Sequence, residues 1–448
     1  MIIISLPYRG PQSLRPAASE YWMEYRLDFC EDLDSIDFSA FNDRCILTYK
    51  GQGNHPDLLS KMLASSALVD IDTDESPNLD YHEYADKLIL SLHLPKFSQD
   101  RIQKLIDLPL KCFAKKVVFE AHSFEEILQT KDMIMMNPPP KIIFNVTGPL
   151  AAFQRSLYRI FASDGVYLYD KESTYPGQLS LRLFELINAN AMDSESIVYG
   201  IIGGKQVNDS YSLWVYNEYF KEIKQHAHYL PIPARSAQEV IMALKYLKEH
   251  FRIKGFSITS PFKSSLPHTL GFGTKAMNSI RFSAIARDEY HYIRELDLYA
   301  NCINTDLIAL RTCLSRLDIT PADAIYIYGS GACAEAFIAF LKETGHHNIY
   351  LGGRNLERCK ALAEQYDLEQ KAPASCDLLI NASSRLYFNS WSELPGFRMA
   401  IELPYKREVS SDLQKFTQES NLPFISGRDF FELQHQAQRD FLLGAEQE

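Results

Sequence analysis

A short apolar strand, a glycine-rich turn and a helix follow one another late in the 448-residue chain. The strand is expected over Ala324–Tyr328, the turn spans Gly329–Ala334, and the helix begins at Glu335. Glycines let the backbone approach phosphate groups, and a helix N-terminus supplies amide donors and the positive end of the helix dipole. The pattern predicts a dinucleotide-binding turn in an α/β domain. More than 300 residues precede it, so they must form something other than a cofactor domain.

Composition and charge narrow the class of protein. The chain has 46% hydrophobic and 23% charged residues, as ordinary soluble globular proteins do. Its net charge of −11 argues against a nucleic-acid partner, which needs a basic patch. No run approaches the roughly 18 apolar residues of a membrane span, and the N-terminus has no basic leader. We expect a cytoplasmic protein that acts on small molecules, with no membrane partner and with its oligomeric state left open.

The eight cysteines are scattered, with no Cys-x-x-Cys pair and no His/Cys cluster of zinc spacing, so we expect reduced thiols and no metal.

Strand-like and helical stretches alternate from residue 1 to about residue 190. The pattern predicts a (β/α)8 barrel, although the region is short for one and several helices must be trimmed. The eight strand-like runs are Ile2–Leu6, Glu24–Phe29, Cys45–Tyr49, Leu68–Asp72, Lys87–His93, Lys116–Phe119, Lys141–Val146 and Gly165–Tyr169. We therefore predict a barrel at 1–194, a substrate-binding domain at 195–318 that is completed by a C-terminal helix at 427–448, and a Rossmann-like NADP-binding domain at 319–426.

Several polar side chains of the last 250 residues follow apolar or extended runs. A proline turn presents Thr259 and Lys263 side by side, and Asp306 follows a later run. A lysine beside an aspartate keeps its charge and can relay a proton during carbonyl reduction. Ser210 and Ser212 offer two hydroxyls at alternate positions, which suits a carboxylate.

Six ordered elements resemble the shikimate dehydrogenase family over residues 198–448. They are Ser210-x-Ser212, Ile258-Thr259-Ser-Pro261-Phe-Lys263, Ala276-Met-Asn278-Ser279, Asn304-Thr-Asp306, the glycine turn, and Gln436-x-x-x-x-Phe441. The resemblance implies a substrate domain and a Rossmann-like domain, with Lys263 and Asp306 as the catalytic dyad. It also implies that Ser210 and Ser212 bind the substrate carboxylate, that Thr259, Asn278 and Gln436 bind ring hydroxyls, and that Tyr405 lines the site.

The charge after the second strand of the cofactor domain favours NADP(H). An acidic residue at this point would bind a ribose hydroxyl, but Arg354, Asn355 and Arg358 stand there instead, which suits a 2′-phosphate. The chain departs from the family pattern at Ala332, at Leu213 and in the loop 381–385, which lacks a glycine. The predicted cofactor-binding residues are Gly329, Ser330, Gly331, Ala332, Arg354, Asn355, Arg358 and Gly427.

Three charged residues alternate along the second strand-like run, at Glu24, Arg26 and Asp28, so they are expected to face the same way. Inward charges at barrel strand ends are costly unless they bind one another or a polar ligand. The pattern resembles the Glu-x-Arg-x-Asp signature of type I 3-dehydroquinate dehydratases. Further elements of that family follow in order: Ser91-x-His93, Lys116, Gly148-x6-Arg155, Phe161-Ala-Ser163 and Thr174-Tyr-Pro-Gly-Gln178.

The resemblance implies a Schiff-base lyase. Lys116 would form an iminium with a ketone, and His93 would move the proton of the neighbouring carbon. Lys115 is a rival for this role, but strand alternation lets only one of the two lysines face inward, and the following Val-Val favours Lys116. Glu24 would orient His93 or the substrate, and the remaining substrate-binding residues would be Arg26, Lys50, Arg155, Thr174 and Gln178. Lys50 stands where the family often has arginine, which weakens bidentate carboxylate binding.

The sequence thus predicts a bifunctional enzyme that dehydrates 3-dehydroquinate to 3-dehydroshikimate and reduces that ketone with NADPH to shikimate. Two alternatives stay open: a quinate/shikimate dehydrogenase that uses NAD, and a non-catalytic regulator built from the same folds.

Overall fold

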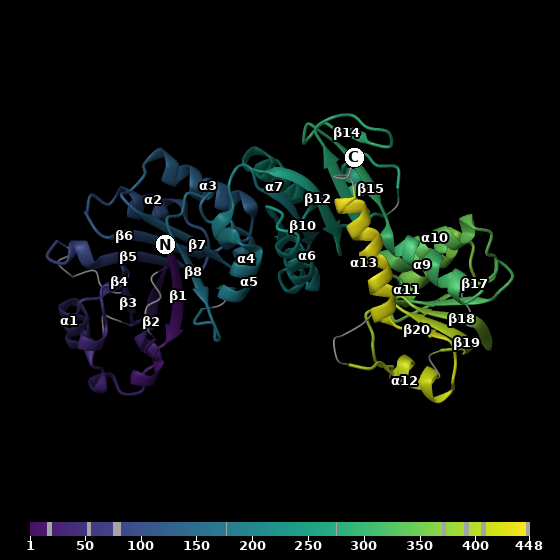
Figure 1. Ribbon diagram of the computed structural model, residues 1–448, viewed down its shortest axis with the longest axis horizontal. Coiled ribbons are helices and arrows are strands. Elements are labelled where there is room, and N and C mark those ends of the chain that lie inside the picture. The colour runs from purple at the N-terminus through teal and green to yellow at the C-terminus, as the bar shows by residue number, and fades with distance from the viewer. Residues whose placement is uncertain are drawn as a thin grey trace. The chain divides into compact units, whose positions relative to one another are not determined.

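The computed structural model describes residues 1–15, 20–51, 55–74, 82–175, 177–274, 276–369, 373–388, 394–404 and 409–444. The chain divides into two compact units, Met1–Ile253 and Lys254–Glu448, whose elements are labelled in Figure 1. The predicted three-part division, 1–194, 195–318 with 427–448, and 319–426, stays a prediction. Within the described residues, no helix has the length and apolar character to span a membrane.

Eight parallel strands form most of one sheet in the first unit. The sheet order is β7-β6-β5-β4-β3-β2-β1-β8-β9. The strands are β1 (Ile2–Pro7), β2 (Tyr21–Arg26), β3 (Cys45–Thr48), β4 (Leu68–Asp72), β5 (Leu88–Leu94), β6 (Ala114–Glu120), β7 (Ile142–Thr147), β8 (Val166–Tyr169) and the short β9 (Leu179–Ser180). The eight predicted strands are confirmed. The predicted bounds of β2 were wrong at both ends, because the strand runs from Tyr21 to Arg26 and Leu27–Phe29 form a 3-10 turn, so Asp28 lies outside the strand.

One apolar residue from nearly every strand contributes to a single buried cluster. Its members come from β1 and β3 to β8, and Trp22 of β2 packs against them: Ile3, Ile46, Leu68, Ile89, Ala114, Ile143 and Tyr167. Side chains alternate along a strand, so the next inward positions lie two and four residues further toward the carboxyl ends. An apolar layer therefore forms the floor beneath those positions, as in the interior of a β-barrel.

The strands β7 and β8 share no backbone ladder in the described residues. They are joined at one end by the Asp164 amide, which donates to the Ile142 carbonyl at 2.7 Å. Further along, the Tyr167 amide donates to Asn145 Oδ1 at 2.8 Å, and Asn145 Nδ2 donates to the Gly165 carbonyl at 3.1 Å. We call this boundary between β7 and β8 the seam. Side-chain hydrogen bonds replace part of the backbone pairing there, and the closed barrel stays a prediction.

Helices follow only some of the strands of this sheet. They are α1 (Pro56–Ala64), α2 (Gln99–Asp107), α3 (Phe124–Met136), α4 (Ala151–Ser156) and α5 (Leu181–Ile187). In the described parts of the β1–β2, β2–β3 and β4–β5 connections the chain forms 3-10 turns instead, in agreement with the predicted trimming. The unit ends with two parallel strands and their helices: β10 (Ile197–Gly203), α6 (Tyr211–Glu222), β11 (Ala227–Pro233) and α7 (Ala237–His250).

The second unit begins within a run of antiparallel strands. These are β12 (Arg252–Ile258), β13 (Ser279–Ser283), β14 (His291–Ile293) and β15 (Leu298–Ile303), with α8 (Phe262–Thr269) and α9 (Thr305–Arg316). The Asn304 side chain caps α9 by accepting from the Asp306 amide, so Asp306 lies in the first turn of that helix. This placement brings the Asp306 carboxylate to the end of β15.

Five parallel strands form the sheet of the predicted cofactor domain, in the order β17-β16-β18-β19-β20. They are β16 (Ile325–Tyr328), β17 (Ile349–Gly352), β18 (Ser375–Asn381), β19 (Gly396–Glu402) and β20 (Phe424–Ile425), with α10 (Ala332–Glu343), α11 (Leu356–Tyr366) and α12 (Asp412–Glu419). The chain runs from β16 to one side and then to the other. Ligands of such sheets bind outside the carboxyl ends of the strands at this reversal.

The last helix, α13 (Gly427–Leu443), confirms the predicted C-terminal helix and runs beside α9 (Figure 1). Its Phe430 belongs to the same buried cluster as Leu310 of α9 and Phe337 of α10. The helix is therefore anchored to both the cofactor sheet and the helix that carries Asp306.

Candidate active sites

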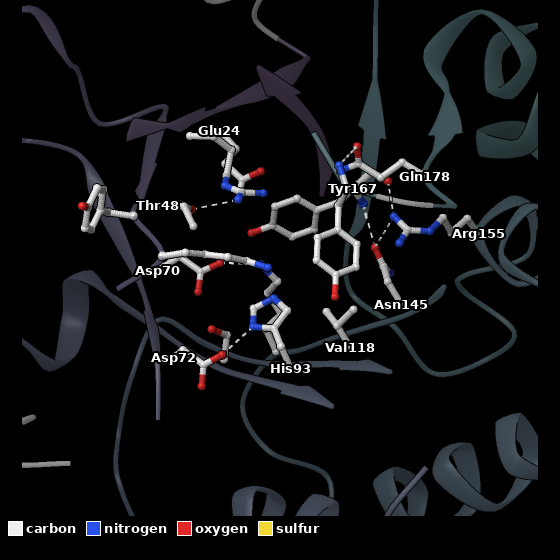
Figure 2. Close-up of a pocket in the computed structure, with 16 residues that line it drawn as sticks. Glu24, Thr48, Asp70, Asp72, His93, Val118, Asn145, Arg155, Tyr167 and Gln178 are labelled. Atoms are coloured by element: carbon white, nitrogen blue, oxygen red, sulfur yellow. Dashed lines mark hydrogen bonds and ion pairs between the residues drawn. The ribbon is translucent and has the colours of Figure 1, made fainter. Parts of the chain in front are cut away.

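A pocket lies above the apolar floor of the first unit, and Figure 2 shows polar side chains from successive strands pointing into it. Seven of the eight residues predicted for this site line the pocket: Glu24, Arg26, Lys50, His93, Lys116, Arg155 and Gln178. The other lining residues are Thr48, Tyr49, Asp70, Asp72, Ser91, Val118, Asn145, Tyr167 and Tyr175. Most occupy the inward positions that strand alternation predicts.

The two neighbouring lysines of β6 face opposite ways. Lys116 points into the pocket, where its Nζ donates to Asp70 of β4 and lies 4.2 Å from the centre of the Tyr167 ring. Lys115 points outward, and its Nζ donates to the carbonyls of Ile106 and Leu108 at 2.7 Å each. Only Lys116 is therefore placed to meet a ligand in the pocket.

His93 is oriented by a second carboxylate of β4. Its Nδ1 lies 2.8 Å from Asp72 Oδ2 (Figure 2), and both side chains are about one-fifth exposed. Burial alone would raise the pKa of Asp72, but hydrogen bonds from His93 and the Asp74 amide, with the charge of Lys116, hold it below its ordinary value. The ionised carboxylate accepts a hydrogen bond from the Nδ1–H group, so Nε2 is left as the nitrogen that can accept a proton.

Glu24 is held by hydroxyl groups rather than by His93. The hydroxyls of Ser5 and Thr48 donate to its two carboxylate oxygens, the second at 2.7 Å. Thr174 lies behind this group, 2.5 Å from the Ser5 hydroxyl and 3.2 Å from Gln178 Oε1. Thr174 thus positions Gln178 and Glu24 and is not itself among the lining residues.

Arg26 is already paired inside the protein. Its Nε and Nη2 donate to the two carboxylate oxygens of Asp28 at 2.8 and 2.7 Å, and its Nη1 donates to the Thr174 carbonyl at 3.2 Å. Lys50 Nζ instead lies over the face of Tyr175, 4.3 Å from the ring centre.

Arg155 bridges the strands β7 and β8. Its Nε and Nη2 donate to the Val146 carbonyl at 3.2 and 3.1 Å, and its Nη1 donates to Asn145 Oδ1 at 3.3 Å and to the Tyr167 carbonyl. The side chain is buried, and this burial lowers its pKa to about 10. Four of its five N–H groups are used in this way. The structure gives Arg155 a place in the seam as well as at the pocket wall.

The sequence analysis missed Asp70, Asp72 and Tyr167. The two aspartates could have been predicted from the sequence, because they stand at alternate positions of the buried run Leu68–Asp72. Carboxylates at inward positions of a buried strand cost free energy unless they are paired, and each of these has a base opposite it.

A second cavity lies at the carboxyl ends of the cofactor sheet, where the strand order reverses. Ser260 follows β12, and the other lining residues come from the end of β16 and the turn after it, the segment after β17 and the loop after β18: Tyr328, Gly329, Ser330, Gly331, Ala332, Cys333, Gly353, Arg354, Asn355, Leu356, Glu357, Ala382, Ser383 and Ser384. Six of the eight predicted cofactor residues are among them. Arg358 and Gly427 are not.

The two glycines of the turn serve different purposes. Gly329 has φ +145°, and a Cβ there would lie 2.7 Å from the Ala382 carbonyl oxygen, so the turn can approach β18 only without a side chain. Gly331 caps α10, and a Cβ there would meet no atom within 4 Å. The open space beside Gly331, at the N-terminus of a twelve-residue helix, fits a pyrophosphate group.

The two arginines that follow β17 make different contacts. Arg354 is exposed at the cavity, and Asn355 caps α11 by accepting from the Arg358 amide at 3.0 Å. The Arg358 side chain donates to the Ser330 carbonyl and lies 3.6 Å from Glu335. Arg354 is thus the arginine that is presented to a ligand, while Arg358 braces the turn. An acidic residue, Glu357, also lines the cavity.

Lys263 and Asp306 form a close ion pair, with Nζ 2.6 Å from Oδ2. Asn278 Nδ2 donates to the other carboxylate oxygen at 3.0 Å, and its own oxygen accepts from the Thr305 amide at 2.8 Å. Burial alone would lower the pKa of Lys263, but the Asp306 charge, the neighbouring Cys333 and the hydrogen bonds to both together hold the pKa above its ordinary value. Lys263 is therefore an ammonium that can donate a proton and stay oriented.

Cys333 joins the glycine turn to this pair. Its Sγ lies 3.3 Å from Asp306 Oδ2 and 3.4 Å from Lys263 Nζ, and the residue also lines the cofactor cavity. Burial, with the nearby carboxylate of Asp306, raises the pKa of the thiol to about 11. The group is therefore a neutral thiol at physiological pH, and the sequence analysis did not single it out.

Other predicted residues of the reductase site are placed less directly. Gln436 is exposed, whereas Gln434 and Gln438 of the same helix donate to Thr305 Oγ1 at 2.9 Å and Ser279 Oγ at 2.8 Å. Thr259 is half-buried after β12. Tyr405 lies outside the described residues.

Two predicted residues mark the start of helices. Ser210 caps α6 by accepting from the Ser212 amide at 3.3 Å, so the two hydroxyls belong to a helix start and not to a strand. Gly427 is the buried first residue of α13.

Comparisons with known proteins point to one enzyme family. No family model matches the chain. It is 28% identical over 192 residues to the shikimate dehydrogenase (NADP(+)) of Clostridium beijerinckii, covering 41% of this chain and 67% of that protein. It is 25% identical over 256 residues to the shikimate dehydrogenase (NADP(+)) of Pyrobaculum islandicum, covering 55% and 93%.

Among solved structures, the dehydroquinate dehydratase and shikimate dehydrogenase from S. pombe AroM covers 94% of this chain and 91% of its own, at 16% identity and a TM-score of 0.41.

Over about half of its length, the chain is therefore homologous to shikimate dehydrogenases. The matched stretch spans 67% of the Clostridium beijerinckii protein, and 57% and 62% of two further shikimate dehydrogenases (NADP(+)), from Dictyoglomus turgidum and Caldanaerobacter subterraneus.

Proposed function

We propose that the chain is a bifunctional enzyme. Its first unit would dehydrate 3-dehydroquinate to 3-dehydroshikimate, and its second unit would reduce 3-dehydroshikimate to shikimate with NADPH. The reductase rests on the homology to shikimate dehydrogenases and on one observation above all: the ion pair of Lys263 and Asp306, 2.6 Å apart and joined through Cys333 to the glycine turn of the cofactor cavity.

In the reductase site, the residues of this chain would bind, orient and protonate. The amides at the start of α10 and the space beside Gly331 would hold the pyrophosphate, and Arg354 the 2′-phosphate. NADPH would supply the hydride to the carbonyl carbon of the substrate. Lys263 would donate a proton to the carbonyl oxygen, which becomes the new hydroxyl, while Asp306 and Asn278 keep the amine in place.

In the first unit, the Lys116 amine would attack the ketone and form an iminium with loss of water. Lys116 must first lose a proton, and the Asp70 carboxylate that touches its Nζ is placed to accept it. His93 Nε2 would then take the proton from the carbon next to the iminium and return it to the departing hydroxyl, so that water leaves. Hydrolysis of the iminium releases the product and restores Lys116.

A closed (β/α)8 barrel would support this chemistry. The apolar cluster drawn from β1 and β3 to β8 and the bridge made by Arg155 between β7 and β8 both favour closure. In such barrels the reacting groups lie at the carboxyl ends of the strands, which is where Lys116, His93 and Glu24 converge.

The reductase is tested by NADPH oxidation with 3-dehydroshikimate as substrate. Lys263→Ala should lower kcat at least a hundredfold, because a positioned general acid contributes about that factor. Lys360→Ala is the matched control, since Lys360 is an exposed lysine that lies 3.9 Å from Glu364 on α11. Absence of NADPH oxidation in the wild type, or full activity of Lys263→Ala, would contradict the proposal. Binding of the metabolite without turnover would favour the regulator.

The dehydratase is tested by borohydride reduction in the presence of 3-dehydroquinate, followed by peptide mass spectrometry. The substrate-derived adduct should form on Lys116 and be absent from Lys116→Met. Lys115→Met should still trap the adduct, because Lys115 is bound to carbonyls outside the pocket. An adduct on Lys115, or none on the wild type, would sink the Schiff-base mechanism.

Glu357 keeps the NAD-dependent alternative open, because an acidic residue in this cavity can accept hydrogen bonds from ribose hydroxyls. The ratio of kcat/KM for NADPH over NADH separates the two. Under the NADP(H) proposal, Arg354→Ala should lower this ratio about tenfold or more, whereas the alternative predicts a ratio below one in the wild type. Cytoplasmic residence stays a prediction from the sequence.

A further inference from the structure

The strands β18 and β19 end side by side on two buried polar residues. Asn381 is the last residue of β18 and Glu402 the last of β19, and they are direct partners in the parallel register. Asn381 is fully buried and Glu402 is 2% exposed. Asn381 Nδ2 donates to Glu402 Oε1 at 3.2 Å. Buried polar groups of this kind persist only where their hydrogen bonds are satisfied.

Asn381 organises the loop that follows it. Its Oδ1 accepts from the Ser383 hydroxyl at 2.7 Å and from the Ser383 amide at 3.2 Å, and its Nδ2 also donates to the Arg385 carbonyl at 2.9 Å. The Ser383 hydroxyl in turn accepts from the Arg385 amide at 3.1 Å. One side chain thus fixes both limbs of the turn at residues 382–385.

This loop faces the cofactor cavity. Ala382, Ser383 and Ser384 line it opposite the glycine turn, and the Ala382 carbonyl is the atom that leaves no room for a side chain at Gly329. A shift of the loop would therefore change the shape of the cavity and its approach to the glycine turn. The orientation of Asn381 decides where the loop lies.

Glu402 sets that orientation from behind. An amide side chain can present either its oxygen or its nitrogen, and Glu402 Oε1 is the acceptor that the Asn381 nitrogen meets. The Ser411 hydroxyl donates to Oε2 and also accepts from the Gln414 amide at 3.0 Å, at the start of α12. Glu402 is therefore held on one side by α12 and holds Asn381 on the other.

We propose that Glu402 is a positioning residue for the dinucleotide: it fixes Asn381, and through Asn381 the cofactor-facing loop Ala382–Ser384. Glu402 lies behind the loop and is not among the residues that line the cavity. The role rests on the proposed NADP(H)-dependent function of the second unit, and extends it to a residue outside the binding surface.

Three variants of the full-length chain test the role. Glu402→Ala removes the acceptor of Asn381 and should weaken NADPH binding about tenfold, a change of 1.4 kcal/mol. Glu402→Gln can accept from Asn381 through its oxygen and donate to Ser411 through its nitrogen, so it should bind NADPH within threefold of the wild type. Thr417→Ala removes a buried hydroxyl of α12 that donates to the carbonyls of Leu413 and Gln414 in its own helix, and controls for general loosening of the domain.

The measurements are the Kd for NADPH by fluorescence titration and the steady-state constants for both substrates. In Glu402→Ala the KM for NADPH should rise, while the KM for 3-dehydroshikimate at saturating NADPH stays within twofold of the wild type. Unchanged NADPH affinity in Glu402→Ala, or equal weakening in Thr417→Ala, would overturn the positioning role. Failure of the wild type to bind NADPH would overturn the proposed function itself, and the role of Glu402 with it.

Discussion

Replacing Arg155 with methionine should destabilise the first unit. The guanidinium makes four hydrogen bonds to acceptors on both sides of the seam between β7 and β8, and it does so where these strands share no backbone ladder in the described residues. Methionine keeps the length and the apolar stem of the side chain and removes all of the donors. The carbonyls of Val146 and Tyr167 lose these donors in a buried environment.

The magnitude follows from two opposing terms. Hydrogen bonds from a charged donor contribute about 1.5–3 kcal/mol each, so the four together contribute at least about 6 kcal/mol. Burial of the charge acts against them, and the lowering of the Arg155 pKa from 12.5 to about 10 corresponds to about 3 kcal/mol. The contribution of the hydrogen bonds exceeds the cost of burying the charge, so their loss should destabilise the unit by at least about 3 kcal/mol. For a unit of this size the shift is about 6–12 °C in Tm.

The assay is thermal unfolding followed by circular dichroism, with NADPH oxidation in the same sample as a reporter of the second unit. Lys50→Met is the matched control, because it removes a pocket cation that lies over Tyr175 and not at the seam. A fall in Tm of less than 2 °C for Arg155→Met, combined with a raised KM for 3-dehydroquinate, would refute the structural role. Arg155 would then act as a substrate anchor alone.

Three further outcomes can be checked directly. Asp72→Asn should lower the dehydratase kcat about tenfold to a hundredfold, because His93 loses the partner that fixes its tautomer, with little change in Tm; an unchanged kcat would exclude this coupling. Alkylation of Cys333 by iodoacetamide, followed by mass spectrometry, should be slow at pH 7, speed up toward pH 11 and be slowed by NADPH; equal rates with and without NADPH would show that the thiol is not in the cofactor cavity. Burial, with the nearby Asp412, raises the pKa of Glu402 from 4.5 to about 7, so the folded protein keeps a proton that the unfolded chain releases, and stability should fall by about 3 kcal/mol as the pH rises from 4.5 to 7. Denaturant unfolding of wild type and Glu402→Gln should therefore diverge above pH 5, with the variant the more stable at pH 8; parallel curves would count against the shift.

Strand positions in the first unit could be predicted well from the sequence. The run Leu68–Asp72 coincides with β4 at both ends, because apolar residues bounded by polar turns mark a buried strand. The end of β2 could not be predicted in the same way. In the sequence, Asp28 continues the alternation of Glu24 and Arg26. In the structure the chain turns after Arg26, and the Asp28 carboxylate accepts two hydrogen bonds from the Arg26 guanidinium. The place where a strand stops depends on such contacts.

Residue roles were less predictable than residue positions. The choice of Lys116 over Lys115 as the inward lysine rested on strand alternation and on the Val-Val that follows, and the structure agrees. The part that Arg155 plays in the seam depends on how strands 142–147 and 166–169 pair, a property of the assembled sheet. The contact of Cys333 with Lys263 could not be predicted from the sequence either, since 70 residues separate them.

The adjacent lysines of β6 have a consequence for how the strand can change. Moving β6 by one residue would turn every side chain to the opposite face. It would carry the amine of Lys116 away from Asp70 and pull that of Lys115 from the carbonyls of Ile106 and Leu108. Two charged groups would lose their partners at once. Lys115 therefore acts as a register lock, and an insertion or deletion within β6 should be tolerated far less well than one in the turns at either end.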